Sequence, residues 1–411
     1  RLGIDVIVAD HHEPGPELPD AVLLDPKQPG CGYPERELAA VGVTFKLCQA
    51  LHQAAGRYRR ELYRYLDLVA LGTIADVVPA LGENRVFMRF GLLQLERTES
   101  AGLRALLELT RLAGKRLSDG SVGFVLAPRI NAAGRMGSAA AGARLLLTDD
   151  PAEAARLAAV LEEENRARRE SDRRTLEEAR AQLASFDPER DRAIVLASPE
   201  WHPGVVGIVA SRLVEEFHRP TVLVALGADG TGKGSARSIQ GFHLYRALAA
   251  CGSHLLEYGG HALAAGLRLE QPRLPAFRDA FGAHARETIR SEDLVRSVRI
   301  DLELSVLGEC ARIFGLLRHF APYGPGNARP VLAARNLRVV GCPRLVGENH
   351  VRMRVTRDGE ALDTIGFQLA HRLQDVNPGR DDLAIAFTLE ADDFTGRGEL
   401  QGRLVDLRAG A

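Results

Sequence analysis

The stretch that most constrains the fold lies near the start of the chain, where residues 4–12 read IDVIVADHH. The apolar run at residues 6–9 lacks the alternation of a half-exposed strand, so it predicts a strand buried on both faces of a parallel sheet. Such sheets bind ligands at the carboxyl ends of their strands, and here that end carries Asp10, His11 and His12. Carboxylate and imidazole bind divalent metals, and imidazole can transfer protons near neutral pH. The triplet alone fits equally well a helix-capping aspartate followed by two surface histidines.

The bulk composition limits the classes of protein to consider. The chain has 411 residues, of which 45% are hydrophobic, enough for roughly two to four domains. Lys+Arg is 53 and Asp+Glu is 54, a formal net charge of -1, so a nucleic-acid-binding surface would have to be a local basic patch. The five cysteines are scattered without a CxxC pair, which argues against a zinc knuckle or a disulfide framework and favours a reducing cytoplasm. The sequence has no signal peptide and no apolar run long enough to cross a membrane.

A second candidate carboxylate is Asp76, in the segment LGTIADVVPALGENR at residues 71–85. It stands among small and apolar residues, where an unpaired carboxylate would be costly to bury. We therefore expect a bound partner for it, with a helix cap or a buried backbone amide as the alternative.

Candidate phosphate ligands occur in the segment APRINAAGRMGS, residues 127–138, which predicts a turn of small residues. Its polar members are Arg129, Asn131 and Arg135. Arginines in such a loop can present several donors to a phosphate at short range. The alternative is that they are solvated surface arginines.

The clearest helix signal covers residues 150–187. Asp150 predicts the N-cap and Pro151 the first helical position. Apolar residues mark both ends of the helix but the middle, residues 162–174, is almost entirely polar, which is typical of a helix that connects two domains. Five arginines of this middle could line the gap, or could form a solvated face balanced by glutamates: Arg166, Arg168, Arg169, Arg173 and Arg174.

A second α/β unit is predicted from residue 193 onward. The segment GKGSARSIQGF, residues 232–242, places Ser235, Arg237 and Ser238 among glycines and short side chains. We expect backbone amides there to approach an anion closely and an arginine to pair with it. The ending and the spacing of a Walker loop are absent.

The segment YGGHALAAGLRL, residues 258–269, crowds small residues around Gly260 and His261. Such crowding indicates a backbone packed tightly around a ligand or another strand. A purely structural histidine is the alternative.

The pattern changes to short alternating strands from residue 298. About five strands and an Asp358-Gly359 turn predict a small barrel of OB type. The segment FAPYGPGNARP, residues 320–330, predicts a rigid Pro/Gly turn within this region. OB barrels bind single strands by stacking bases on aromatic rings in a basic groove. The candidate rings here are Tyr323, Phe367 and Phe394, with core packing favoured for Phe367.

Seven segments, in this order, resemble motifs of the RecJ family in the DHH phosphoesterase superfamily: VADHH, LGTIADVVP, APRINAAGRM, WHPGVVGIVASRL, GSARSI, GGHALAAG and APYGPGN. VADHH alone indicates only the superfamily, whereas the whole series extends across nearly all of the chain. The resemblance implies an α/β fold in four parts: a parallel-sheet DHH domain at residues 1–149, a long connecting helix at 150–187, a second α/β DHH-associated domain at 188–290 and an OB-type β-barrel that binds nucleic acid at 294–411.

The resemblance also implies an activity. It implies a metal-dependent 5′→3′ exonuclease that hydrolyses single-stranded DNA to 5′-mononucleotides in recombination and repair, with Mn²⁺ or Mg²⁺ as the cofactor. The implied ligand is single-stranded DNA with a 5′ end, the candidate protein partners are a single-strand-binding protein and a RecQ-type helicase, and no membrane is involved. One alternative is a DHH-type oligonucleotide or cyclic-dinucleotide phosphodiesterase, which residues 298–408 disfavour. The other is a non-catalytic single-strand-binding scaffold, which the intact histidines and Asp76 disfavour.

Roles for individual residues follow from the resemblance alone. His11 and Asp76 resemble metal ligands, Asp10 the residue that orients the histidine pair, and His12 the histidine that contacts the scissile phosphate or protonates the leaving group. The implied phosphate- and DNA-binding residues are Arg129, Asn131, Arg135, Ser235, Arg237, Ser238, Gly260 and His261.

One departure from the family pattern concerns the metal site. The family has earlier aspartate motifs that supply further ligands to a two-metal site, and none precedes Asp10 here. Since the chain starts at Arg1, within the predicted sheet, we expect it to be an N-terminally truncated fragment with part of the metal site missing. We expect this fragment to be inactive, or nearly so, on its own.

Overall fold

The structure is a computed structural model that describes residues 3–15, 17–347, 349–376, 378–391 and 399–410. The candidate ring of Phe394 lies outside the described residues. Contacts between Cα atoms divide the chain into two compact units. Unit 1 contains Arg1–Arg97, Arg116–Val122 and Ser297–Ala411, and unit 2 contains Thr98–Lys115 and Gly123–Arg296.

Unit 1 starts with a pair of short strands. β1 (Ile7–Ala9) and β2 (Val22–Leu24) pair in parallel, with Ile7 opposite Val22. Both of these side chains are exposed. The predicted parallel pairing is therefore present, but the prediction of a strand buried on both faces is wrong, because no other described strand joins this sheet.

Four helical elements follow in unit 1: α1 (Ala40–Ala54), the 3₁₀-helix η1 (Arg59–Tyr65), α2 (Leu66–Ala75) and α3 (Gly82–Leu95). They share a core that includes Phe45, Leu62 and Phe87. Gly91 marks the close crossing of α2 and α3, because a Cβ atom there would lie 2.2 Å from the carbonyl oxygen of Leu66. The core of these helices fixes the end of α2, where Asp76 is the C-cap residue.

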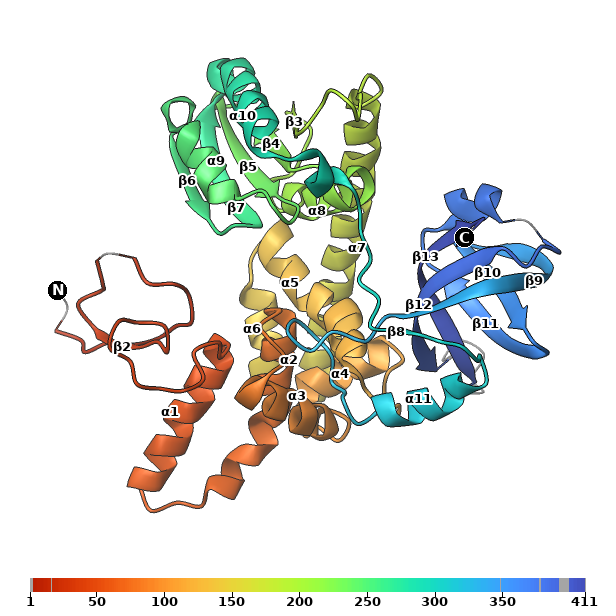
Figure 1. Cartoon of the computed structure of the whole chain (residues 1–411). Helices are drawn as coiled ribbons and strands as arrows, with labels where there is room; N and C mark the ends of the chain where they lie inside the picture. The colour runs from red at the N-terminus through yellow and green to blue at the C-terminus, as the bar shows by residue number, and fades with distance from the viewer. Residues whose placement is uncertain (1–2, 16, 348, 377, 392–398, 411) are drawn as a thin grey trace. The chain divides into compact units, whose positions relative to one another are not determined.

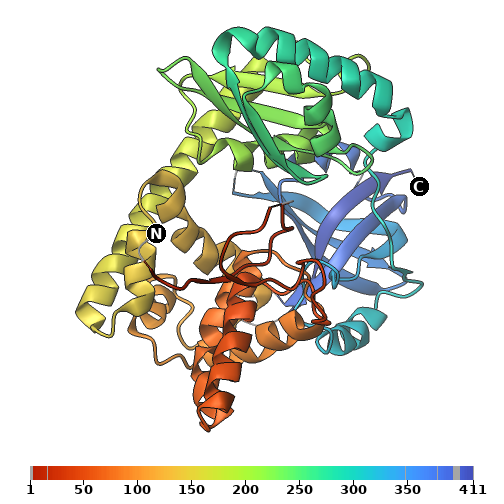
Figure 2. The ribbon, with the colours of Figure 1, turned by 90° about the vertical axis from the view of Figure 1, so that its left-hand side faces the viewer.

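The C-terminal part of unit 1 is a closed barrel, as predicted. Its strands are β9 (Leu332–Val346), β10 (His350–Arg357), β11 (Glu360–Gly366), β12 (Leu383–Ala391) and β13 (Leu400–Ala409). The sheet order β10-β11-β13-β12-β9 closes because β9 also pairs with β10 (Figures 1 and 2). Asp358 and Gly359 have φ of 52° and 83°, and these left-handed angles suit the predicted two-residue hairpin turn. A short strand, β8 (Leu302–Glu303), and a helix, α11 (Glu309–Leu317), precede the barrel.

The Pro/Gly turn before the barrel is attached to the segment that follows Asp76. The backbone N–H of Ala80 donates to the carbonyl oxygen of Pro325 at 2.7 Å. Arg85 Nη2 donates to the carbonyl oxygens of His319 and Phe320 at 3.1 and 3.0 Å. The same short segment therefore carries the candidate metal ligand and holds the turn that leads into the barrel.

Unit 2 contains the predicted long helix. α7 (Pro151–Gln182) begins as expected, because Asp150 accepts a hydrogen bond from the backbone N–H of Ala152 at 2.9 Å. α4 (Ala101–Leu109), α5 (Ala127–Met136) and α6 (Ala140–Leu147) pack against it. The predicted turn over residues 127–138 is wrong: most of it is α5, since alanine is the best helix former and Pro128 lies in the first turn. None of the helices in the described ranges is both long enough and apolar enough to cross a membrane.

The sheet of unit 2 has the order β3-β4-β5-β7-β6. Its strands are β3 (Ile194–Ser198), β4 (Thr221–Leu226), β5 (Thr231–Arg237), β6 (Glu257–Gly260) and β7 (Ala264–Glu270). β3 and β4 are parallel and the other pairs are antiparallel. The prediction that backbone amides of residues 232–242 approach an anion is wrong for the part up to Arg237. This part is β5, which lies between β4 and β7, so its backbone amides belong to the sheet.

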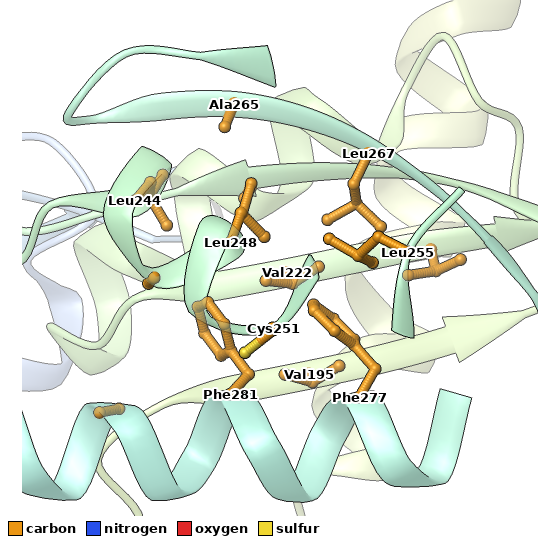
Figure 3. Close-up of a cluster of buried hydrophobic side chains, with 14 of the residues drawn as sticks. Val195, Val222, Leu244, Leu248, Cys251, Leu255, Ala265, Leu267, Phe277 and Phe281 are labelled. Carbon is orange, nitrogen blue, oxygen red and sulfur yellow. The ribbon is translucent and has the colours of Figure 1, made fainter. Parts of the chain in front are cut away.

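Helices cover both faces of this sheet. On one face, α9 (Leu244–Ala250) and α10 (Leu274–Thr288) close a core in which Phe277 and Phe281 point from α10 toward Val195 and Val222 (Figure 3). On the other face lies α8 (Val206–Phe217). The residues before α8 form the WHPG segment, so this packing places the segment at the end of β5 that carries Arg237.

Candidate functional site

The candidate site in unit 1 contains a histidine and a carboxylate. His11 follows β1 and Asp76 ends α2, and the structure brings them together with His11 Nε2 3.1 Å from Asp76 Oδ2. The imidazole is largely buried and the carboxylate is half-exposed. An imidazole nitrogen and a carboxylate oxygen this close together, at a partly open position, could both bind the same metal ion.

Asp10 organises the two histidines beside this pair. Its Oδ1 accepts the backbone N–H of His11 at 2.7 Å and that of His12 at 3.3 Å, and lies 2.7 Å from His12 Nδ1. These hydrogen bonds, the one to the His12 ring foremost, lower the pKa of Asp10. The carboxylate therefore stays ionised near neutral pH and fixes the ring of His12, whose side chain is exposed.

These residues supply only part of a metal site. Among the residues that the structure describes, no group of three or more His, Cys, Asp or Glu side chains is arranged to hold a metal ion. Mg²⁺ prefers six ligands, mostly oxygens. His11 and Asp76 can thus contribute two ligands, but among the described residues they do not form a closed site.

A separate candidate within unit 2 is a pair of arginines, Arg135 at the end of α5 and Arg237 at the end of β5. Burial, and next the charge of Arg135, lower the pKa of Arg237. Arg237 Nη1 donates to its neighbour's carbonyl, Ala236 O, at 2.8 Å, and Arg135 Nη1 to Gly204 O at 3.4 Å. Within the described ranges neither guanidinium forms an ion pair with a carboxylate. Two neighbouring cations that lack a carboxylate partner among the described residues have the charge that attracts an anion.

Two glycines at the start of α8 let these arginines approach. A Cβ atom on Gly204 would lie 2.3 Å from the carbonyl oxygen of Arg135. A Cβ atom on Gly207 would lie 3.1 Å from Arg237 Nη2 and 3.3 Å from Ser235 Oγ. Three segments that are far apart in the sequence therefore meet at the first turn of α8.

We expect Gly204→Ala to destabilise the protein by about 1–3 kcal/mol, since the new methyl group would collide with the backbone of Arg135. The measurement is urea unfolding of the variant and the wild type. Gly259→Ala is the matched control, because a Cβ atom there meets nothing within 4 Å. Equal stability of the two variants would show that the contact is not tight.

A buried carboxylate beside the arginine pair was missed by the sequence analysis. The side chain of Asp172, on α7, is 1% exposed, and its Oδ2 lies 2.9 Å from Arg212 Nη2 and 4.0 Å from Arg168 Nη1. Burial raises the pKa of Asp172 despite the two arginines. Burial also lowers the pKa of Arg168, helped by the positive charges of Arg135, Arg169 and Arg212. The available signal was that Asp172 is the only aspartate inside a helix whose other acidic residues are glutamates.

A third candidate surface lies on the barrel. By strand register, Arg344 is opposite Arg352, Arg352 is opposite Ile365, and Ile365 is opposite Arg403. The guanidinium of Arg403 lies 4.8 Å from the ring centroid of Phe367, which is 41% exposed. A row of arginines beside an exposed ring has the composition of a single-strand-binding surface.

Tyr323 is not available for stacking, contrary to expectation. Its side chain is buried, and its hydroxyl donates to the carbonyl oxygen of Leu317 at 2.6 Å. Arg329 covers the ring at 4.8 Å from the centroid.

Comparison with known proteins places the chain in a family. Three family models match: "DHH family, N-terminal domain" at residues 1–73, "DHHA1 domain" at 190–287 and "RecJ OB domain" at 300–406. The single-stranded-DNA-specific exonuclease RecJ of Escherichia coli (strain K12) is 37% identical over 420 residues, which cover 97% of this chain and 72% of the relative. The chain belongs to the RecJ family.

Other RecJ proteins extend this comparison. The single-stranded-DNA-specific exonuclease RecJ of Bacillus subtilis (strain 168) is 38% identical over 410 residues, covering 99% of this chain and 51% of the relative. The crystal structure of RecJ in complex with Mn²⁺ from Thermus thermophilus matches with a TM-score of 0.83 at 36% identity, covering 100% of this chain and 59% of that one. The chain thus spans about half the length of the Bacillus RecJ. The predicted family and the predicted α/β fold with an OB barrel are confirmed, whereas the exact domain boundaries stay predictions.

The remaining RecJ-like candidates have contacts of their own. Arg129 pairs with Glu162 and donates from Nη1 to Val125 O at 2.6 Å, so its guanidinium is already engaged. Asn131 is exposed on α5. The hydroxyl of Ser238 donates to Phe242 O at 2.8 Å and closes the turn after β5.

Gly260 and His261 lie at the end of β6. Gly260 has a φ of 139°, and a Cβ atom there would lie 2.5 Å from Ala264 O, so the close approach of β7 explains this glycine. His261 is exposed. Ala264 is opposite Arg237 across the sheet and accepts the backbone N–H of His261 at 2.8 Å. The DNA-binding roles of all these residues stay predictions.

Proposed function

We propose that this chain is part of a divalent-metal-dependent exonuclease that degrades single-stranded DNA from its 5′ end to 5′-mononucleotides, in recombination and repair. The observation that carries the proposal is the pair Arg135 and Arg237, which meet at the first turn of α8 without a carboxylate partner in the described ranges. Such a pair, with the hydroxyl of Ser235 beside it, suits a terminal phosphate. The names of the relatives, single-stranded-DNA-specific exonucleases, support the choice of substrate.

We assign His11 and Asp76 as two ligands of a Mn²⁺ or Mg²⁺ ion, in line with the RecJ crystal structures that hold these metals. When bound, such an ion supplies an activated water and neutralises phosphate charge. Asp10 holds the ring of His12 through Nδ1, which leaves Nε2 to contact the scissile phosphate or to give a proton to the leaving oxygen. Independently, within unit 2, Arg135 and Arg237 bind a terminal phosphate.

The choice of a single strand rests on the barrel. The arginine row at Arg344, Arg352 and Arg403 would follow the phosphates of a strand, and Phe367 would stack on a base. A duplex offers no unstacked base to this ring. The single-strand-binding protein and the RecQ-type helicase stay predictions.

The test is digestion of 5′-phosphorylated DNA, labelled at its 3′ end, in the presence of Mn²⁺. The 411-residue chain and the protein made from the complete reading frame are assayed in parallel. We expect the protein made from the complete reading frame to release mononucleotides from the 5′ end of a single strand and to leave a blunt duplex intact. We expect the 411-residue chain to be inactive, or nearly so, in the same assay. Digestion of the duplex at the same rate, or removal of the 3′ label first, would contradict the proposal. A strand that is bound but never shortened would favour the scaffold alternative.

A further inference from the structure

One surface feature contains none of the site residues described above. The turn between α1 and η1 and the whole of η1, residues 57–65, read RYRRELYRY. Three of the 7 tyrosines of the chain and four arginines fall within this stretch. The turn is the end of the hairpin that α1 forms with η1 and α2 (Figures 1 and 2). We call residues 57–65 the hairpin tip.

The hairpin tip carries uncompensated positive charge. In the described ranges its arginines form no ion pair with a carboxylate: one donates to the side chain of Gln53 and another to the hydroxyl of Tyr65. Glu61, the one acidic residue of the stretch, lies 4.0 Å from His52 Nδ1. Three exposed arginines elsewhere, Arg180, Arg273 and Arg290, are instead each paired with a carboxylate. In a chain with a net charge of -1, this is a local basic patch.

The tyrosines of the hairpin tip present their rings to solvent. Leu62 is buried and attaches η1 to the core, while Tyr58, Tyr63 and Tyr65 are 80%, 48% and 42% exposed. The guanidinium of Arg64 lies 4.7 Å from the ring centroid of Tyr65. An exposed aromatic ring contributes little to the core of its own protein, and amphipathic tyrosine rings are enriched where a protein contacts a ligand.

We propose that the hairpin tip is a further binding surface for single-stranded nucleic acid, in which arginines contact phosphates and the rings of Tyr58 and Tyr63 stack on bases. The choice of ligand rests on the proposed function, but the surface shares no residue with the candidate site. Exposed rings interleaved with unpaired arginines fit a chain that offers both negative charge and flat bases. A duplex offers the charge without free bases, and an acidic peptide offers no bases at all.

The test is fluorescence anisotropy of a labelled oligo-dT in EDTA, which prevents metal-dependent cleavage, over a range of salt concentrations. For the triple variant Arg57→Gln, Arg59→Gln, Arg60→Gln, we expect weaker binding and a plot of log Kd against log salt whose slope is smaller by about 2. For Tyr58→Ala we expect affinity to fall about tenfold with an unchanged slope.

The matched control is Arg180→Gln, Arg273→Gln, Arg290→Gln, which removes the same charge from arginines that already have carboxylate partners. We expect it to bind like the wild type. All variants change exposed side chains, so their urea unfolding midpoints should coincide, and Tyr58→Ala gives a readout that does not depend on charge.

The outcomes separate the two proposals. If the wild type binds no single strand, the proposed function itself is wrong. If the wild type binds but the tip variant and the control have equal affinities and slopes, only the hairpin-tip inference is overturned. A third outcome would also overturn the inference: the arginine variant loses affinity, Tyr58→Ala does not, and polyglutamate competes with oligo-dT as well as unlabelled oligo-dT does. The hairpin tip would then be a general anion-binding surface.

Discussion

Replacing Asp76 by asparagine is expected to lower the metal-dependent nuclease rate by about 100-fold or more. Substitution of residues that merely orient metal ligands typically costs 10- to 100-fold, and a direct ligand should cost at least as much. Asp76 Oδ2 lies 3.1 Å from His11 Nε2, so asparagine keeps the shape of the pair and removes the charge that would attract the cation. The measurement is the rate of mononucleotide release by the protein made from the complete reading frame, at a fixed Mn²⁺ concentration.

Asp20→Asn is the matched control for this prediction, since Asp20 is an exposed aspartate of the same unit. We expect it to keep the wild-type rate. A second readout is Mn²⁺ binding by the 411-residue chain, which should be weaker in Asp76→Asn than in Asp20→Asn. Wild-type activity in Asp76→Asn would remove this residue from the metal site.

The largest expected effect on stability is at Asp172. We expect Asp172→Ala to lower the free energy of unfolding by about 3–5 kcal/mol, the range seen when one partner of a buried ion pair is removed. The alanine would leave Arg212 and the largely buried guanidinium of Arg168 without the carboxylate that they share, next to the charges of Arg135 and Arg169. Urea unfolding at neutral pH is the measurement, and Asp172→Asn, which keeps a hydrogen-bond acceptor, should cost less than the alanine variant.

Glu170→Ala is the control on the same helix. Glu170 and its partner Arg173 are both exposed, so solvent screens the pair and its loss should hardly change the stability. If Asp172→Ala lowers the free energy of unfolding no more than this control does, solvent already screens the charges of the arginines around Asp172. The carboxylate would then not be needed to hold these arginines together.

The sequence predicted those features that depend on local pattern. Alternating strand patterns and the Asp358-Gly359 turn were enough to predict the barrel. Asp150 followed by Pro151 was enough to predict where α7 begins. The two histidines and Asp76 were found because their motifs are specific, although only the fold shows that His11 and Asp76 lie 3.1 Å apart. Their chemical roles remain proposals.

The errors arose where the role of a residue depends on its neighbours in space. The glycines of residues 232–242 were expected to let backbone amides approach an anion. Gly232 and Gly234 instead lie within β5, where Cβ atoms would be 2.6 Å from a side-chain atom of Val224 and 2.8 Å from one of Leu267. Asp172 looked like one more charge in a polar helix, because its burial depends on the packing of α8 against α7. The hairpin tip carried no functional prediction, since the exposure of its side chains cannot be known before the fold.

The division of the chain into units also fixes the order in which its parts can be completed on the ribosome. Unit 1 is discontinuous, because its barrel follows all of unit 2 in the sequence. The roughly 300 residues from the end of its first segment to the end of β13 take on the order of 15–60 s to synthesise at about 5–20 residues per second. Within that time unit 2 is complete as soon as Arg296 has been added, before any strand of the barrel exists. Ala80 gains its hydrogen-bond partner only once Pro325, in the Pro/Gly turn before the barrel, has been made. The middle of this polypeptide is therefore able to fold before its beginning.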